Sequence, residues 1–416
     1  QNAPVILTEA KTSNASSSEL RVEGMTCNNC ARKVTDVVQA YHLDGTLNAE
    51  RDNLVVVLHA LTGTPDAAGD WWSSLIGPGR VVDTTRYAVL APNLLGSCYG
   101  TTGPANRAEP FPAVTPRGMP RLVGRLVDRL GVSQVALITG GSLGGMVTLE
   151  WNLLHPHRAL RTAVLAAPAR SSVETLGWNH IQRTAIESLG DAGMGLARMV
   201  GMMTFRTEQE FEARFGPGAR RTLPGYLDHH AALLRARFHR GSYLTLLGAM
   251  DAHDLGRGRG GLDAALARLT GRVIGVGVDT DRLFYAAEVR DWTARAGVPY
   301  HEIASILGHD AFLLETEQVG RILADLLGEM PCIPTPGELT TSATERSGGL
   351  GGHERGEGRD PGAGDGLVLA SNDPAQVAHL PPVKNEVNEP VAGTNPVAAG
   401  DRLGVQSIQV DRPGAA

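Results

Sequence analysis

A serine set among glycines is the first feature of the sequence with chemical potential. Residues 140–146 read GGSLGGM and follow the apolar run VALIT. The segment fits G-x-S-x-G, and a strand before it with a helix after it is the setting in which a sharp turn exposes a nucleophilic hydroxyl. Glycines suit such a turn because larger side chains would obstruct it. The pattern predicts Ser142 as a nucleophile. The alternative, a phosphate-binding glycine turn, lacks both G-x-G-x-x-G and a Lys-Ser/Thr pair.

An activated serine needs a base and an acid, expected later in the chain in the order Ser, Asp/Glu, His. The segment VIGVGVDTDRLF ends a predicted strand with Asp279 and Asp281, and both remain candidates for the acid. One further strand, YHEIASI, precedes His309, which heads a helix predicted to begin near Ala311. The sequence holds 13 histidines, so chain order and placement select His309. A structural histidine on a polar loop is the alternative.

Two backbone N–H groups are needed to hold the oxyanion that forms when the serine attacks. The residue after the nucleophile, Leu143, is predicted to supply one of them. The loop HALTG follows the run LVVVL, and Leu61 within it is predicted to supply the other. His59 lies in the same loop, but it precedes the serine in the chain, so we expect a structural or positioning role for it.

The elements that must position these residues alternate between apolar runs and helical patterns. Continuous apolar runs predict buried strands over 54–60, 87–95, 135–141, 160–169 and 272–279. Helical patterns lie between them, as at 120–131 and 145–156. This alternation predicts an α/β fold, a mostly parallel sheet with helices on both faces.

Composition divides the chain further. Residues 1–33 form an atypical, mostly polar segment that contains GMTCNNC, and the core is predicted over 34–170 and 262–328. Between these parts, 171–261 lacks strand patterns and is predicted to be an inserted helical cap. The Gly- and Pro-rich residues 329–416 are predicted to be a disordered tail.

Charge and cysteine content exclude several classes of protein. The net charge of −6 gives no basic surface for nucleic acid. No apolar stretch approaches the roughly 20 residues needed to cross a bilayer. Four cysteines do not make a disulfide framework in a chain of 416 residues, and the first residues lack a secretory pattern, so the cytoplasm is the expected compartment.

Longer stretches of the sequence resemble a known family. NLVVVLHALTG, TGGSLGGMVTLEW, DTDRLF and GHDAFLLE are similar to the homoserine O-acyltransferases of methionine biosynthesis, over about residues 40–327. The resemblance implies an α/β-hydrolase fold with a helical cap, and transfer of acetyl from the co-substrate acetyl-CoA to L-homoserine, with no bound cofactor. It also implies a homodimer. It assigns the nucleophile to Ser142, the base to His309 and, because the family's aspartate directly precedes x-L-F, the acid to Asp281.

The same resemblance implies residues that hold an amino-acid substrate. Asp310, in GHD, corresponds to the position that binds the amino end, and Arg198, in MGLARM, corresponds to the arginine that binds the carboxylate. Arg183, in IQRTAI, ranks behind it, and a surface ion pair is the alternative role for Arg198. A serine acceptor, a succinyl donor and a simple esterase remain alternative activities.

A second, shorter resemblance lies near the N-terminus. GMTCNNC is similar to the loop of heavy-metal-associated domains, in which two thiolates hold a soft cation. The core pattern begins only about ten residues later, so a complete domain of that kind, roughly 70 residues, does not fit. We therefore expect no metal at Cys27 and Cys30, and a metal-binding protein is the third and most distant function.

Overall fold

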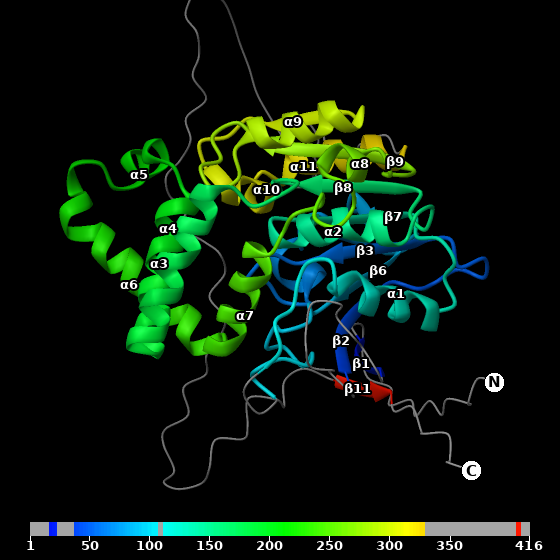
Figure 1. Ribbon diagram of the computed structural model, residues 1–416, viewed down its shortest axis with the longest axis horizontal. Helices are drawn as coiled ribbons and strands as arrows, with labels where there is room; N and C mark the ends of the chain where they lie inside the picture. Colours follow the sequence, from blue (N-terminus) through cyan, green and yellow to red (C-terminus); the bar gives the residue numbers. More distant parts are fainter. Residues whose placement is uncertain (1–15, 23–36, 107–110, 329–404, 409–416) are drawn as a thin grey trace, which may run out of the picture. The chain divides into compact units, whose positions relative to one another are not determined.

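A nine-stranded sheet forms the centre of the computed structural model, which describes residues 16–22, 37–106, 111–328 and 405–408 (Figure 1). Among these residues the strand order is β10-β9-β8-β7-β3-β6-β2-β1-β11. The strands are β1 (Ser16–Val22), β2 (Val37–Asp44), β3 (Leu54–Leu58), β6 (Ala88–Pro92), β7 (Leu137–Gly141), β8 (Arg161–Leu165), β9 (Arg272–Val278), β10 (Tyr300–Ile303) and β11 (Val405–Ile408).

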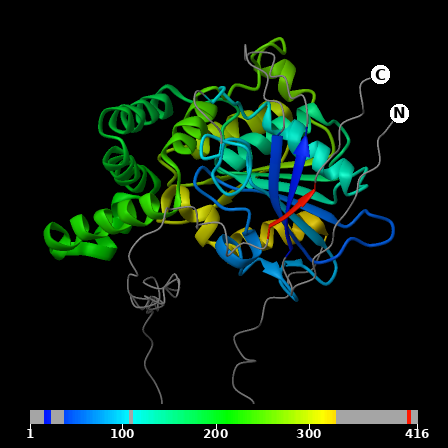
Figure 2. The ribbon, with the colours of Figure 1, turned by 90° about the horizontal axis from the view of Figure 1, so that it is seen from below.

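The sheet is parallel from β6 to β10, and the five apolar runs singled out in the sequence all lie in this part. Strand β10 is the further strand expected before His309. Strand β2 pairs antiparallel with both β6 and β1, and β11 lies beside β1 (Figure 2). Strands β1, β2 and β11 were not predicted from the sequence.

Both faces of the sheet are covered, as the continuous apolar strands require. In β3, Val56 and Leu58 pack into one core, and Val55 and Val57 pack into the other. The first core contains α1 (Met119–Arg129), α2 (Leu143–Leu154), α8 (Leu262–Leu266) and α9 (Ala286–Ala296). The second contains α10 (Ala311–Leu314) and α11 (Thr316–Leu327). The α/β class is confirmed.

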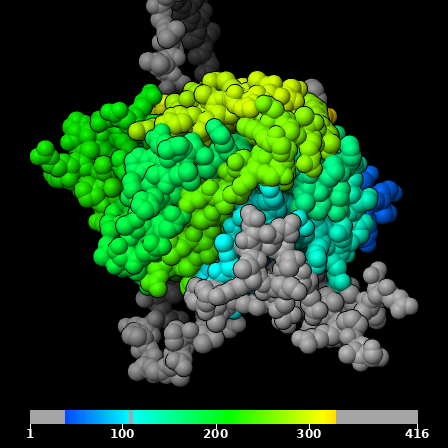
Figure 3. Space-filling view, viewed as in Figure 1, coloured from blue at the N-terminus to red at the C-terminus, as the bar shows by residue number. Residues whose placement is uncertain are grey.

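A helical insertion separates β8 from β9, as the cap prediction expects. Its elements are α3 (Val173–Leu189), α4 (Asp191–Phe205), α5 (Glu208–Phe215), η2 (Gly216–Gly218), α6 (Ala219–Arg237) and α7 (Arg240–Asp251). In the space-filling view these residues, coloured green, gather on one side of the core (Figure 3). Shorter elements of the core are η1 (Ala67–Trp71), β4 (Ile76–Gly77), β5 (Val82–Asp83) and η3 (Gly308–Asp310).

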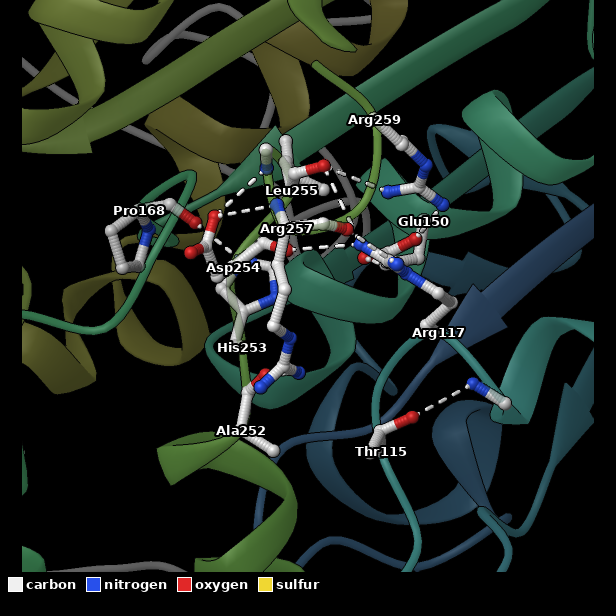
Figure 4. Close-up of polar contacts among 12 residues, drawn as sticks. Thr115, Arg117, Glu150, Pro168, Ala252, His253, Asp254, Leu255, Arg257 and Arg259 are labelled. Atoms are coloured by element: carbon white, nitrogen blue, oxygen red, sulfur yellow. Dashed lines mark hydrogen bonds and ion pairs between the residues drawn. The ribbon is translucent and has the colours of Figure 1, made fainter. Parts of the chain in front are cut away.

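An ion-pair network ties the exit of the cap to helix α2. Glu150 of α2 is 2% exposed and accepts hydrogen bonds from Arg117 Nε at 3.4 Å and from Arg259 Nη2 at 2.5 Å (Figure 4). Arg117 also donates to the carbonyl oxygen of Arg257 at 2.7 Å. Because the carboxylate and both guanidinium groups are engaged within the protein, this cluster fixes the segment after α7 against the helix that starts beside Ser142.

Some of the sequence predictions fall outside the described residues. The chain divides into a compact unit, 1–331 with 398–416, and a second unit, 332–397, and the described ranges all belong to the first. Cys27 and Cys30 lie outside them. Of the segment 329–416, the structure describes Val405–Ile408, which form β11. No helix within the described ranges is long and apolar enough to cross a membrane.

Candidate active site

Ser142 sits in a strained backbone conformation between β7 and α2. Its φ of 59° and ψ of −124° lie in a region that residues with a side chain seldom adopt. Such a conformation costs about 1–3 kcal/mol and persists only where the surroundings impose it. Here the Ser142 N–H donates to the carbonyl of Leu165 at 3.0 Å, and its carbonyl accepts from the N–H of Met146 at 3.0 Å. Bonds to β8 and α2 thus hold the turn in place.

The glycines around Ser142 are explained by close contacts. A Cβ on Gly144 would lie 2.1 Å from the carbonyl oxygen of Leu58, at the end of β3. A Cβ on Gly140 would lie 2.8 Å from the same oxygen, and a Cβ on Gly141 would lie 2.2 Å from the ring of Phe312. None of these three has a positive φ. Their role is therefore to let β3 and Phe312 approach the turn.

His309 and Asp281 form a buried pair at the ends of neighbouring strands. His309 Nδ1 lies 2.7 Å from Asp281 Oδ2, and the two side chains are 4% and 0% exposed. The other oxygen of Asp281 accepts the N–H groups of Leu283 at 2.8 Å and Phe284 at 2.9 Å. Asp279 instead accepts from the N–H of Ser305, so Asp281 is the aspartate that contacts the imidazole.

Electrostatics around His309 favour its protonated form. Burial lowers the pKa of His309, but the charge of Asp281 and its hydrogen bond to Nδ1 outweigh burial, and the pKa lies above its usual value. The hydrogen bond to Asp281 at Nδ1 leaves Nε2 as the nitrogen able to exchange a proton with a nucleophile.

Aromatic rings enclose the imidazole and connect it to the turn at Ser142. The ring centroids of Phe284, Phe312 and Phe205 lie 5.1, 5.5 and 5.8 Å from that of His309. Phe312 is also the ring against which Gly141 packs, so the residue before Ser142 and the imidazole contact the same side chain. Such apolar surroundings strengthen electrostatic interactions within the site.

The loop that follows β3 is held by His59. The N–H of Leu94 donates to His59 Nε2 at 2.9 Å, which leaves Nδ1 to donate to the carbonyl of Ala60 at 2.7 Å. Burial lowers the pKa of His59 to about 4, so it is neutral at pH 7. His59 therefore shapes the loop. Leu61, in that loop, and Leu143, at the first position of α2, donate no hydrogen bond from their N–H groups to the described part of the chain.

The two cap arginines differ in their partners. Arg183 pairs with Asp251, which also accepts from Asn179 at 2.8 Å. Arg198 has neither a hydrogen bond nor an ion pair with the described residues, and its guanidinium lies 5.8 Å from the ring centroid of Phe205. Burial lowers the pKa of Arg198 while the charge of Asp310 acts to raise it. Arg198 is thus the one of the two with its charge available to a ligand.

Asp310 is engaged with a residue that the sequence analysis missed. Arg206 Nε donates to Asp310 Oδ2 at 2.9 Å, across 104 residues of sequence. The motif T-x-x-E at 207–210 is a helix-start signal, and Thr207 does accept from the N–H of Glu210 at 3.0 Å. That signal predicts a helix break beside Arg206, but nothing in the sequence connects Arg206 to Asp310.

Metal ligation has no support in the described ranges, where no cluster of three or more His, Cys, Asp or Glu side chains is arranged to hold an ion. The site combines a serine in a strained turn with a buried His–Asp pair. It also holds two backbone N–H donors and an arginine that have no hydrogen-bond partner among the described residues. This set is suited to acyl transfer through a serine ester.

Comparisons with known proteins agree with this chemistry. Residues 53–253 match the family model described as alpha/beta hydrolase fold. A homoserine O-acetyltransferase of Thermus thermophilus is 44% identical over 318 residues, covering 67% of this chain and 83% of that relative. The crystal structure of a homoserine O-acetyltransferase from Staphylococcus aureus has a TM-score of 0.68 at 28% identity, covering 77% and 97% of the two chains. An acetylester hydrolase from Corynebacterium glutamicum shares the fold at 21% identity, with a TM-score of 0.67 over 75% and 96%.

Proposed function

The chain belongs to the homoserine O-acetyltransferase family and is an acyltransferase, and we propose that it moves acetyl from acetyl-CoA to the hydroxyl of L-homoserine through Ser142. The observation that carries the proposal is the buried His309–Asp281 pair, which contacts the same Phe312 ring as the strained turn at Ser142. A serine held by its neighbours in a costly conformation points to a functional requirement.

In the first half-reaction, Ser142 attacks the thioester. His309 Nε2 takes the hydroxyl proton as Oγ forms a bond to the acetyl carbonyl carbon, and the N–H groups of Leu61 and Leu143 bind the oxyanion. The carbon–sulfur bond then breaks, the electron pair leaves with sulfur, and His309 returns the proton to it. Coenzyme A departs as the thiol, and acetyl remains on Ser142 as an ester.

In the second half-reaction, the acceptor takes the place of the thiol. His309 removes the proton from the homoserine hydroxyl, whose oxygen attacks the ester carbon. The bond to Ser142 Oγ breaks, His309 gives the proton to that oxygen, and O-acetylhomoserine leaves. Asp281 keeps the imidazole in the correct tautomer and stabilises its charged form in both halves.

The acceptor's charged ends need complementary groups. The unpaired Arg198 is suited to a carboxylate, which a guanidinium binds in a bidentate fork. Asp310 is suited to the ammonium group, because Arg206 occupies Oδ2 and Oδ1 accepts no hydrogen bond from the described residues. The positive charge of this region also acts on His230, whose pKa is lowered to about 4 by burial and by the charges of Arg198, His229 and Arg206.

A homodimer formed through the cap is part of the proposal. Seven of the eleven exposed large hydrophobic side chains of the described residues belong to the cap: Val173, Leu176, Ile181, Leu189, Leu196, Met203 and Leu233. Burial of some of these side chains between two copies would favour association. The low cysteine content favours the cytoplasm.

One assay separates the proposed activity from its alternatives. The protein is incubated with acetyl-CoA, with and without homoserine, while CoA thiol is followed and O-acetylhomoserine is detected by mass spectrometry. Rapid CoA release that does not depend on homoserine would favour hydrolysis, the activity named for the Corynebacterium glutamicum structure. Parallel arms with succinyl-CoA and with serine test the other donor and the other acceptor.

A further inference from the structure

Arg206 lies between two carboxylates from different parts of the site. Its Nε donates to Asp310 Oδ2 at 2.9 Å, and its Nη1 lies 3.7 Å from Glu210 Oε1. The side chains of Arg206 and Glu210 are 11% and 5% exposed. A nearly buried cation is therefore shared between an anion on the turn after His309 and an anion on cap helix α5.

The contact between Arg206 and Glu210, on the cap side, is not a complete hydrogen bond. Arg206 Nη1 and Glu210 Oε2 are buried and have no hydrogen-bond partner among the described residues. Buried polar atoms are nearly always paired, so these two mark a place where a second arrangement is available. Arg206 Nη1 lies 3.7 Å from the other oxygen of this carboxylate, Oε1, which is too long for a hydrogen bond, and a shift of the guanidinium by less than 1 Å would make one.

The backbone around Arg206 is fixed, so the shift involves the guanidinium alone. The Thr207 hydroxyl donates to the carbonyl of Ile306, in the loop before His309. A Cβ on Gly308 would lie 2.7 Å from the carbonyl oxygen of Phe205. The cap segment 205–207 and the turn carrying Asp310 are thus in direct contact, while Arg214 Nε holds Glu210 Oε1 at 2.6 Å.

We propose that Arg206 is a positioning residue for the acceptor. Arg206 divides its charge between Asp310 and Glu210, so Glu210 determines how much of the Asp310 carboxylate is left for the acceptor's ammonium group. The inference rests on the proposed function of Asp310. When an ammonium group reaches Oδ1, repulsion between the two cations moves the guanidinium toward Glu210, where Nη1 gains the hydrogen bond it lacks.

The test replaces Glu210 by Gln and measures the two half-reactions separately. Without the second carboxylate, Arg206 stays on Asp310 and competes with the acceptor. KM for homoserine is expected to rise about tenfold, while single-turnover CoA release from acetyl-CoA stays within about twofold, because the first half-reaction involves no ammonium group. The preference for homoserine over 4-hydroxybutanoate, which lacks the amine, is expected to fall by about the same tenfold.

A second variant and a matched control complete the experiment. Arg206→Lys keeps a cation beside Asp310 but cannot span to Glu210, so the same loss of amine preference is expected, and this variant carries the test if Glu210→Gln does not fold. The control is Asp191→Asn, which removes an exposed carboxylate paired with Arg240 in the same cap and is expected to change neither quantity.

The outcomes separate this inference from the proposed function. Equal losses with homoserine and 4-hydroxybutanoate, or a slower first half-reaction in both variants, would overturn the role of Arg206 and indicate a purely structural network. Absence of homoserine acetylation by the wild-type protein would instead overturn the proposed function, and it would be evident before any variant is made.

Discussion

The turn at Ser142 and the cap around Arg198 are held by different kinds of contact. At the turn, glycines let backbone and aromatic atoms approach so closely that a Cβ would clash, as between Gly144 and the carbonyl of Leu58. In the cap, charged side chains define the geometry, and some of their polar atoms are left without partners, as at Arg206 and Glu210. Steric packing fixes positions tightly, whereas long charged side chains can rearrange.

From this difference we expect the two regions to have different functions in the reaction. In the proposed mechanism, bond making needs reacting atoms held close to one geometry, a role that suits the packed turn and the buried His309–Asp281 pair. Selection of an acceptor needs charges that respond to a ligand, which the cap provides. Substitutions at the turn should therefore affect both half-reactions, and substitutions in the cap should affect the second.

Ser142→Ala is expected to have the largest effect. In the proposed mechanism the triad works as a unit, so removing the nucleophile should lower kcat on the order of a millionfold while leaving the fold intact. Acetyl-CoA turnover and mass-spectrometric detection of the acetylated serine provide the measurement. Activity within tenfold of the wild type would contradict the mechanism, and loss restricted to the second half-reaction would contradict the division between the regions.

Asp281→Asn is expected to lower kcat by about ten-thousandfold, because the imidazole loses the partner that fixes its tautomer. The pH profile tests the cause. In the wild type, the raised pKa of His309 should place the acidic limb of kcat/KM at a higher pH than an ordinary histidine would, since the base must be neutral to accept a proton.

Without the Asp281 charge, burial is the main influence left on His309, and it lowers the pKa. The acidic limb of the variant should therefore move to lower pH. A limb that stays in place would show that another group sets the profile. Asp279→Asn is the matched control, because Asp279 binds the N–H of Ser305, and its profile should not shift.

The parallel part of the fold could be predicted from the sequence because its signals are local or follow from topology. Continuous apolar runs identified the parallel strands, and chain order together with strand-end position selected His309. Strand β2, with the sequence VVQAYHLD, mixes polar and apolar residues and pairs antiparallel with β6, so its identity depends on its neighbours. The polar β1, SSSELRV, carries still less strand signal.

The charged region was harder to predict. Arg198 and Asp310 were reached through a family resemblance, whereas Arg206 and Glu210 were not reached at all. The reason is physical. Arg206 contacts Asp310 across 104 residues through side-chain atoms, and a single sequence records no such pairing. Its surroundings also do not look unusual, since an arginine beside a helix start is common on protein surfaces.

Arg198→Gln tests whether the cap acts on binding of the acceptor. Loss of the unpaired guanidinium should raise KM for homoserine by about a hundredfold, the effect expected for a hydrogen-bonded charge pair of roughly 3 kcal/mol. The first half-reaction should change little. Arg183→Gln is the control, because Arg183 is committed to Asp251, and its KM should stay within about threefold. Equal effects of the two substitutions would contradict the proposal that Arg198, and not Arg183, binds the acceptor's carboxylate.

His59→Gln is expected to have the smallest effect on activity, within about tenfold, because His59 shapes the Leu61 loop without exchanging a proton. Its larger effect should be on stability. Burial lowers the pKa of His59 to about 4 in the folded protein, whereas an unburied histidine in the unfolded chain keeps the ordinary pKa of 6.5. Between these values the unfolded state binds more protons, so the free energy of unfolding falls as pH falls from 6.5 toward 4.

A glutamine at position 59 does not titrate, so its variant lacks this part of the pH dependence. Urea unfolding at pH 7 should show the variant destabilised by about 1–3 kcal/mol through the lost bonds to Leu94 and Ala60. At pH 4.5 the gap to the wild type should narrow by about 2 kcal/mol. If the stability difference between the two proteins were the same at pH 7 and pH 4.5, His59 would be charged in the folded protein at pH 4.5. A millionfold loss of activity would make His59 a candidate for the base. It would also contradict the assignment of a structural role to His59 and a proton-transfer role to the His309–Asp281 pair.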